Sequence, residues 1–244
     1  MSEPVVPLIE MVDLEKTSPG LPTIRVRRLT VRPGDRYTIQ GLDAGAAEAL
    51  VHLITGAALP DRGEVLIEGR RTADVGTDME WLASLDRFGI VTERAVLLDG
   101  FSLAGNLALP ITLEIDPIAD DVRRRVDALA RSVGLEVTAL DRPAANLTPL
   151  ERMRVHLARA LATDPRTLLL EQPTATLDST AARAFGESLR RVADERHLSW
   201  VAFANDEIFA DAAAGRRGSL NLETGEWTDR ATGFWRRVLP TAFR

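Results

Sequence analysis

The chain has 244 residues, a formal net charge of −6 and no cysteine, which excludes a disulfide framework and thiolate chemistry. Its acidic balance also argues against a broad nucleic-acid-binding surface, because neutralising phosphates takes clustered cations, and we expect no nucleic-acid partner. The most apolar long segment, 95–113, is interrupted by Asp99, Asn106 and Pro110, and the N-terminus shows no secretory pattern, so neither a membrane span nor a signal peptide is predicted.

The first half of the chain predicts strands separated by turns. Residues 8–14, 23–31 and 37–40 are expected as strands, and the third leads into a turn of small residues followed by an amphipathic helix. The turn residues are Gly41, Ala44, Gly45 and Ala46. Next come a hairpin beginning at 64–68, a short helix at 78–85 and a buried strand at 88–92.

The second half predicts helices and then a return to strand–helix alternation. The expected helices are 102–109, 119–133, 148–162, 181–197 and 207–214; the strands are 167–170 and 200–203, with a hairpin around 223–225. This order indicates a single α/β domain, 1–228, with a mainly parallel sheet and an N-terminal antiparallel part. Its core would be 1–100 and 163–228, with an inserted helical subdomain at about 101–162. A tail, 229–244, could pack on the domain, mediate dimerisation or rest on an anionic membrane.

The stretch from Tyr37 to Gly56 has the strand–loop–helix order of a phosphate-binding P-loop. In the full pattern, GxxxxGK[ST], the lysine reaches the phosphates and the hydroxyl holds magnesium. Counted from Gly41, the last three positions carry Ala46, Ala47 and Glu48, and Lys16 is the only lysine in the chain. An ordinary βα turn, with alanines that favour the helix start and Glu48 interacting with the helix dipole, explains the same residues.

The segment 146–179, NLTPLERMRVHLARALATDPRTLLLEQPTATLDS, resembles the signature helix, Walker B strand and D-loop of the ATP-binding cassette (ABC) family of transporter ATPases. The parts RVHLARAL (154–161) and PTATLDS (173–179) are the most similar, and LALPITL (107–113) resembles lipoprotein-release and macrolide-export members. The resemblance covers nearly the whole chain. It implies a P-loop NTPase-like ABC ATPase fold, ATP and magnesium as cofactors, a sandwich dimer and a membrane permease as partner.

The resemblance also implies which positions would face nucleotide, and most of them depart from the family pattern. The Q-loop glutamine falls on Glu93, the Walker B aspartate and catalytic glutamate on Glu171 and Gln172, the switch histidine on Asn205, and the adenine-stacking aromatic near Ser18. The implied nucleotide-binding positions are Gly41, Asp43, Ala44, Gly45, Ala46, Ala47, Glu48, Ala49 and Glu93. The signature and dimer positions are Leu147, Thr148, Pro149, Leu150, Glu151 and Asp178.

These departures predict a degenerate site. Without the lysine there is no main protein cation for the phosphates, and a glutamine cannot serve as general base, so no residue is assigned as catalytic or metal-binding. We expect a pseudo-ATPase subunit, a homodimer or heterodimer at the inner face of the cell membrane. It would dock a permease through a groove lined by 88–107, which includes Glu93. The alternative is a working ATPase with atypical site residues. His52, His156 and His197 are interpreted as surface or hydrogen-bonded core residues.

Overall fold

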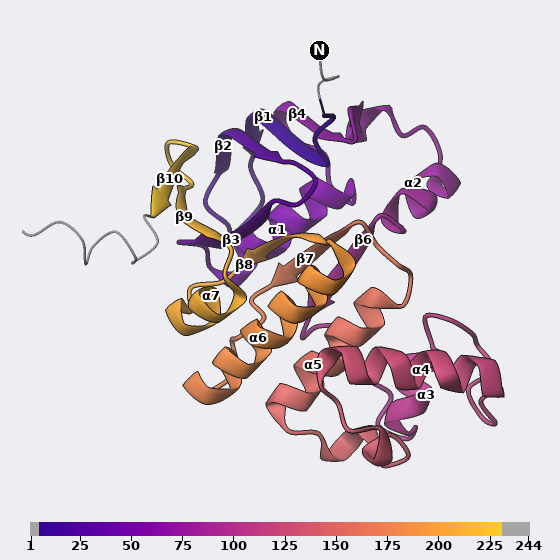
Figure 1. Cartoon of the computed structure of the whole chain (residues 1–244). Helices are drawn as coiled ribbons and strands as arrows, with labels where there is room; N and C mark the ends of the chain where they lie inside the picture. The colour runs from indigo at the N-terminus through magenta and orange to yellow at the C-terminus, as the bar shows by residue number, and fades with distance from the viewer. Residues whose placement is uncertain (1–4, 231–244) are drawn as a thin grey trace, which may run out of the picture.

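The computed structural model describes residues 5–230 and shows two sheets with helices packed between and below them (Figure 1). The first sheet is antiparallel and has the strand order β2-β1-β4-β5. Its strands are β1 (Ile9–Lys16), β2 (Ile24–Val31), β4 (Arg62–Ile67) and β5 (Arg70–Arg71). No helix in the described part of the chain is long and apolar enough to cross a membrane.

The second sheet has the strand order β10-β9-β3-β8-β7-β6 and is parallel apart from β10. Its strands are β3 (Arg36–Gln40), β6 (Phe88–Thr92), β7 (Thr167–Glu171), β8 (Ser199–Phe203), β9 (Arg216–Asn221) and β10 (Glu226–Arg230). The carboxyl ends of β3, β6, β7 and β8 therefore share one edge, which is where open α/β sheets place their ligand sites.

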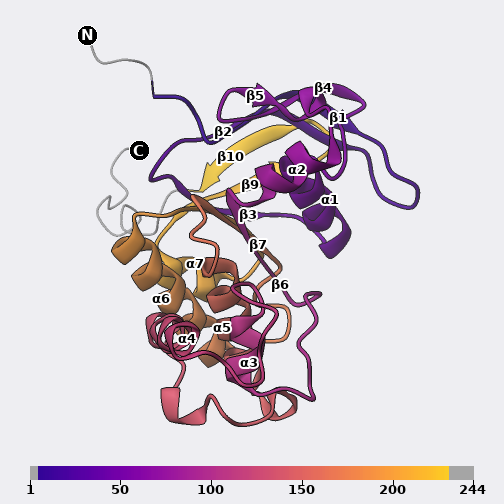
Figure 2. The same ribbon diagram turned by 90° about the vertical axis from the view of Figure 1, so that its right-hand side faces the viewer.

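Helices cover both faces of the parallel sheet (Figure 2). They are α1 (Ala44–Thr55), α2 (Asp78–Leu85), α3 (Leu103–Ala108), α4 (Asp120–Val133), α5 (Pro149–Leu161), α6 (Ser179–Arg196) and α7 (Glu207–Ala213), with 3₁₀ turns at Thr72–Asp74, Val137–Ala139 and Ala144–Asn146. Strand β7 is apolar because its side chains are buried on both faces of the sheet. Leu169 belongs to the core that α1 forms with both sheets, whereas Leu168 and Leu170 belong to the core that the sheet forms with α3–α7.

The predicted mainly parallel sheet, the antiparallel N-terminal part and the inserted helices are confirmed, and α2 and β6 have the predicted bounds. One local prediction is wrong: Ala44, Gly45 and Ala46 belong to helix α1 and not to a turn. The helix starts early because Asp43 caps it. The boundaries 1–228, 1–100, 163–228 and 101–162 stay predictions. β10 continues through Arg230, and residues 231–244 of the expected tail lie outside the described residues.

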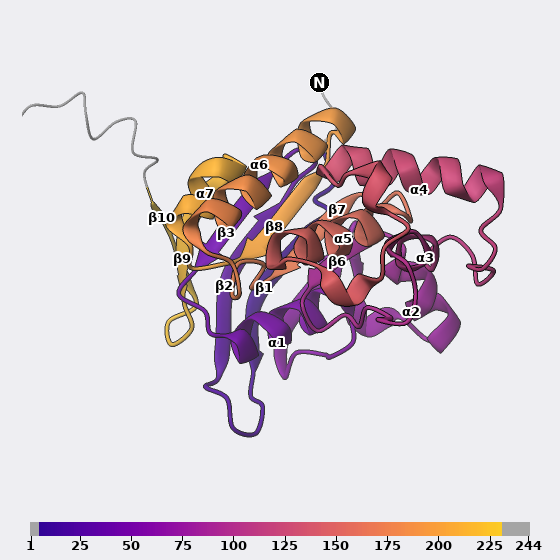
Figure 3. The same ribbon diagram turned by 90° about the horizontal axis from the view of Figure 1, so that it is seen from below.

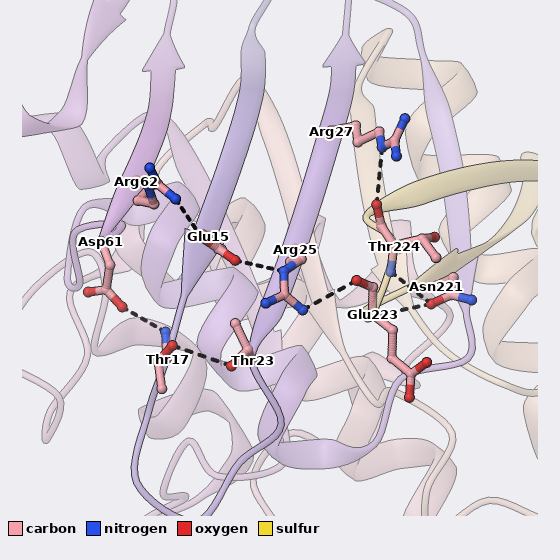
Figure 4. A network of polar contacts seen from close by, with 10 residues as sticks. All are labelled: Glu15, Thr17, Thr23, Arg25, Arg27, Asp61, Arg62, Asn221, Glu223 and Thr224. Carbon is pink, nitrogen blue, oxygen red and sulfur yellow. Dashed lines mark hydrogen bonds and ion pairs between the residues drawn. The ribbon is translucent and has the colours of Figure 1, made fainter.

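The C-terminal hairpin is fastened to the first sheet through β2 (Figure 4). Arg25 Nη1 and Arg27 Nε donate to the backbone oxygens of Glu223 and Thr224 at 3.3 and 3.2 Å, and Arg27 N donates to Gly225 O at 2.8 Å. The guanidinium of Arg25 also binds Glu15 on β1 at 2.7 Å. These contacts join the last described strands of the second sheet to the first sheet.

Candidate functional site

The start of α1, where the P-loop resemblance falls, is capped by the chain's own carboxylate. Asp43 Oδ1 accepts a hydrogen bond from Ala46 N at 2.8 Å, and Ala47 N donates to Asp43 O at 3.0 Å. A helix N-terminus binds anions through such amides. Here the carboxylate of Asp43 accepts the hydrogen bond that a bound anion would otherwise accept. Ala47 is fully buried and Ala49 packs against the core, so the alanines of this stretch serve helix packing.

A leucine side chain lies against the same helix start. A Cβ atom added to Gly45 would come within 2.6 Å of Leu21 Cδ2, so a larger residue there would push the leucine side chain aside. Leu21 belongs to the loop between β1 and β2, and its amide donates to Ser18 O at 3.2 Å. The loop on which the family's adenine-stacking position falls, near Ser18, thus places an aliphatic residue against the backbone at Gly45.

An arginine joins the two carboxylates that fall at the magnesium-binding positions. Arg94, two residues after β6, forms ion pairs with Glu48 on α1 and with Glu171 at the end of β7; its Nη2 lies 2.6 Å from Glu171 Oε2. The Glu171 side chain is only 6% exposed. Burial alone would lower the pKa of Arg94, but the hydrogen bonds to Glu171 and Glu48 outweigh it and raise the pKa.

The ion-pair cluster corrects one interpretation and adds a residue. Glu48 is the fifth residue of α1, beyond the first turn where the helix dipole acts, and it pairs with Arg94 instead. Sequence reasoning missed Arg94. The signal was its position just past β6, because residues that follow neighbouring parallel strands meet at the carboxyl edge of the sheet.

The two amide side chains at the catalytic and switch positions hold the loop before α1. Gln172 Nε2 and Asn205 Nδ2 both donate to Leu42 O, at 3.1 and 2.9 Å. Asn205 Oδ1 in turn accepts from Gly41 N at 2.8 Å. Because these amides are engaged with the backbone at Gly41 and Leu42, they fix the loop in its present conformation.

The Q-loop and D-loop positions are also engaged within the chain. Thr176 Oγ1 donates to the carboxylate of Glu93, which ties the segment after β6 to the segment after β7. Asp178 caps α6, since its Oδ1 accepts from Ala181 N at 2.8 Å. The structure therefore gives Asp178 a local structural role.

The start of α5, where the signature resemblance falls, forms a complete capping box. Thr148 and Glu151 exchange hydrogen bonds, with Thr148 N 2.9 Å from Glu151 Oε2, and Pro149 occupies the first helical position. Glu151 also pairs with Arg142. Burial would raise the pKa of Glu151, but the hydrogen bonds from Thr148 and Arg142 lower it overall. Leu147 and Leu150 pack against the helical core.

A hollow of about 270 Å³ lies between β6, the segment after it and α5. His156 on α5 lines it and is 3% exposed, yet neither ring nitrogen makes a hydrogen bond with any described residue. The interpretation of His156 as a hydrogen-bonded core residue is therefore wrong. Burial, followed by the charges of Arg159 and Arg152, lowers the pKa of His156 to about 4. Glu93 is not among the residues that line this hollow.

A protein-family model described as "ABC transporter" matches residues 26–175. The lipoprotein-releasing system ATP-binding protein LolD 2 of Caulobacter vibrioides is 33% identical over 206 residues, which cover 82% of this chain and 88% of that protein. Two solved structures share the fold. One is cbiO1 from Clostridium perfringens, with a TM-score of 0.74 and 18% identity over 87% of this chain and 84% of that one. The other is the dimeric cassette MJ0796 bound to ADP and Pi, with a TM-score of 0.70 and 23% identity over 86% and 93%.

In the mainly parallel sheet, strand β3 leads through a short loop into α1, and helices are inserted between β6 and β7. This arrangement defines the class of P-loop-type ATP-binding cassettes. The matched family model includes β3, α1, β6, the inserted helices and β7. This chain belongs to the ABC transporter family.

Proposed function

We propose that this chain is a non-hydrolysing ATP-binding-cassette subunit, a structural or regulatory partner of a membrane permease. The observation that carries the proposal is the guanidinium of Arg94 between Glu48 and Glu171. A triphosphate with magnesium needs a lysine, a hydroxyl and a carboxylate at this edge of the sheet. The chain has Ala47 at the lysine position and Glu48 at the hydroxyl position. Glu171, at the carboxylate position, already forms an ion pair with Arg94.

Electrostatics oppose a triphosphate at the start of α1. Asp43 and Glu48 put two carboxylates among residues 43–48 at the helix start, where like charges would repel a phosphate. The amide of Gln172 cannot accept a proton from water, and it is bound to Leu42 O. The residues present thus do not fit the ATP–magnesium complex, and we assign no hydrolytic step to them.

The start of α5 supports the same proposal for a partner's nucleotide. In a sandwich dimer, the signature of one subunit covers the phosphates bound by the other. Here Pro149 has no amide hydrogen, and the amides of Thr148 and Glu151 are used within the capping box. A homodimer would have no working site, whereas a heterodimer could hold one ATP on the partner's P-loop. The dimer of MJ0796 motivates this arrangement.

The hollow beside α5 is the proposed docking place for the permease, at the inner face of the membrane. Its neighbourhood carries the exposed apolar side chains Ile90 and Val96, which are 37% and 73% exposed, and the buried imidazole of His156, which has no hydrogen-bond partner among residues 5–230. Exposed apolar residues around a hollow are typical of protein–protein contacts. The name of the relative LolD 2, a lipoprotein-releasing system protein, suggests a permease of that kind.

Equilibrium binding of a fluorescent ATP analogue with magnesium tests the proposal. We expect no binding by the unaltered chain at micromolar concentration. The double variant Ala47→Lys, Glu48→Ser should gain measurable binding but little turnover, because Gln172 and Asn205 stay in place. The variant Glu48→Ser alone is the control, since it removes the like charge without restoring the cation.

Micromolar binding by the unaltered chain, abolished by changes at residues 45–48, would reject the scaffold proposal in favour of an ATPase with atypical residues. Brisk hydrolysis by the double variant would show that the catalytic group lies elsewhere.

A further inference from the structure

Helices α4, α5 and α6 pack against one another (Figure 3). Two arginine side chains, one from α5 and one from α6, lie close together at the end of α4. Gly134 ends α4 in a left-handed conformation, with φ at 84°. A Cβ atom at Gly134 would lie 3.2 Å from Arg191 Nη2 of α6 and 3.3 Å from Arg154 Cζ of α5. The two guanidinium groups therefore approach each other beside this glycine.

No carboxylate of residues 5–230 forms an ion pair with either guanidinium. Among the residues that the structure describes, neither Arg154 nor Arg191 forms an ion pair within 4 Å, in contrast to Arg94, Arg123 and Arg142. Arg154 Nη1 donates to Gly134 O at 3.0 Å, while its buried Nε has no hydrogen-bond partner in this part of the chain. Burial and then the charge of Arg191 lower the pKa of Arg154, and Glu151 opposes the effect. Two cations held together in this way attract an anion.

We propose that Arg154 and Arg191 form an anion site that binds a phosphoryl group at the junction of α4, α5 and α6. The planar fork of N–H donors on each guanidinium suits the oxygens of a phosphate, and two such groups from different helices can grip separate oxygens. Within residues 5–230, Arg154 Nη2 and the guanidinium of the exposed Arg191 make no hydrogen bond, so these groups are the donors that an anion would meet. This inference is independent of the proposed scaffold role, because it concerns helices that lie away from Gly41 and Glu48.

A purely structural role for Arg154 is the competing explanation. Its hydrogen bond to Gly134 O helps to end α4, and a cation is favourable at a helix C-terminus. In that case Arg154 matters for stability, and Arg191 has no role in binding. The Arg191 side chain therefore separates the two explanations without disturbing the α4 cap.

Calorimetric titration of the full chain with inorganic phosphate, at constant ionic strength set with chloride, tests the site. We expect saturable binding that weakens at least about tenfold in Arg191→Gln, since one set of charge-assisted hydrogen bonds is lost. Arg190→Gln is the matched control, because it removes the same charge from the neighbouring position on α6. The Arg154 Nε–Hε NMR signal should shift when phosphate is added and should not shift when chloride is added.

A second arm identifies the source of the phosphoryl group. Sedimentation with vesicles of phosphatidylglycerol or phosphatidylcholine measures binding to a lipid phosphate. Retention on the anionic vesicles only, lost in Arg191→Gln and kept in Arg190→Gln, supports the site with a lipid headgroup as ligand. Binding of free phosphate without vesicle retention supports the site with a soluble phosphate. Equal effects of the two substitutions in both arms, or no preference for phosphate over chloride, would overturn the proposal.

Discussion

The start of α1 and the hollow beside α5 satisfy their polar groups in opposite ways. Around α1, Asp43 caps the helix, Arg94 joins Glu48 to Glu171, and Asn205 holds the loop backbone. Beside α5, the imidazole of His156 is buried, and neither nitrogen has a hydrogen-bond partner in the described part of the chain. Buried polar groups without partners are costly, and proteins keep few of them.

This difference indicates which of the two sites would gain more free energy from binding a partner. A site that has satisfied its donors and acceptors internally gains little from a ligand, because binding would break existing contacts. A site with unused polar groups and exposed apolar neighbours gains from both. The comparison therefore supports the proposal of a docking subunit, and three sets of substitutions can break or sharpen it.

The largest expected effect concerns His156 in acid. Its folded-state pKa of about 4 lies below the ordinary value of 6.5, so the unfolded chain takes up the proton first as the pH falls. The free energy of unfolding should therefore decrease between pH 6.5 and about 4, by about 3 kcal/mol, and His156→Leu should lack this part of the decrease. Urea unfolding at several pH values measures it.

His52→Leu is the control for the loss of a histidine, because it removes a half-exposed imidazole of α1. If His156→Leu loses stability in acid as steeply as the unaltered chain, the imidazole is not held neutral in the fold. A bound permease segment that reaches His156 would be expected to change the same profile.

The second effect concerns Arg94. Arg94→Ala leaves Glu171, which is 6% exposed, without its cation, and breaking a buried pair is strongly destabilising. Because Arg94 itself is 48% exposed, water screens the pair, and we expect a loss of about 2 kcal/mol. Urea unfolding at neutral pH measures the loss. The surface pair Arg28–Glu10 supplies the control, with Arg28→Ala costing about 0.5 kcal/mol or less. Equal losses in the two variants would contradict a structural cluster at the start of α1.

The smallest effect compares the two amide side chains on the loop. Asn205→Ala removes two hydrogen bonds to Gly41 and Leu42 and should cost about 1.5 kcal/mol, whereas Gln172→Ala removes one and should cost about 0.7 kcal/mol. Thermal unfolding of the two variants beside the unaltered chain gives both values. The reverse order would mean that Gln172, and not Asn205, fixes the loop.

Much of the fold was predictable because local pattern and burial agree. The apolar run of β7 is buried on both faces, and the spacing in α4 places Val126, Leu129 and Val133 in the core. The start of α1 was harder. Small residues suggested a loop from Gly41 to Ala46, but the Asp43 cap, visible in the sequence, outweighed the glycine at position 45 and set the helix start.

The contacts of the site could not be predicted from local pattern. Arg94 meets Glu171 across 77 positions of the chain, and Asn205 meets Gly41 across 164. Both contacts depend on strand order in the parallel sheet, which brings the segments after β6, β7 and β8 to one edge. The unpartnered state of His156 likewise depends on how α5 packs against β6. A helical pattern predicts that a residue faces the core, but it does not predict whether its polar atoms find a hydrogen-bond partner there.

The most direct test of the account is a crystal structure of the chain grown with ATP and magnesium at millimolar concentration. The account predicts Arg94 between Glu48 and Glu171, Leu21 against Gly45, and no triphosphate at the start of α1. A triphosphate seated on the backbone at Gly45, with Arg94 turned away from Glu48, would contradict it.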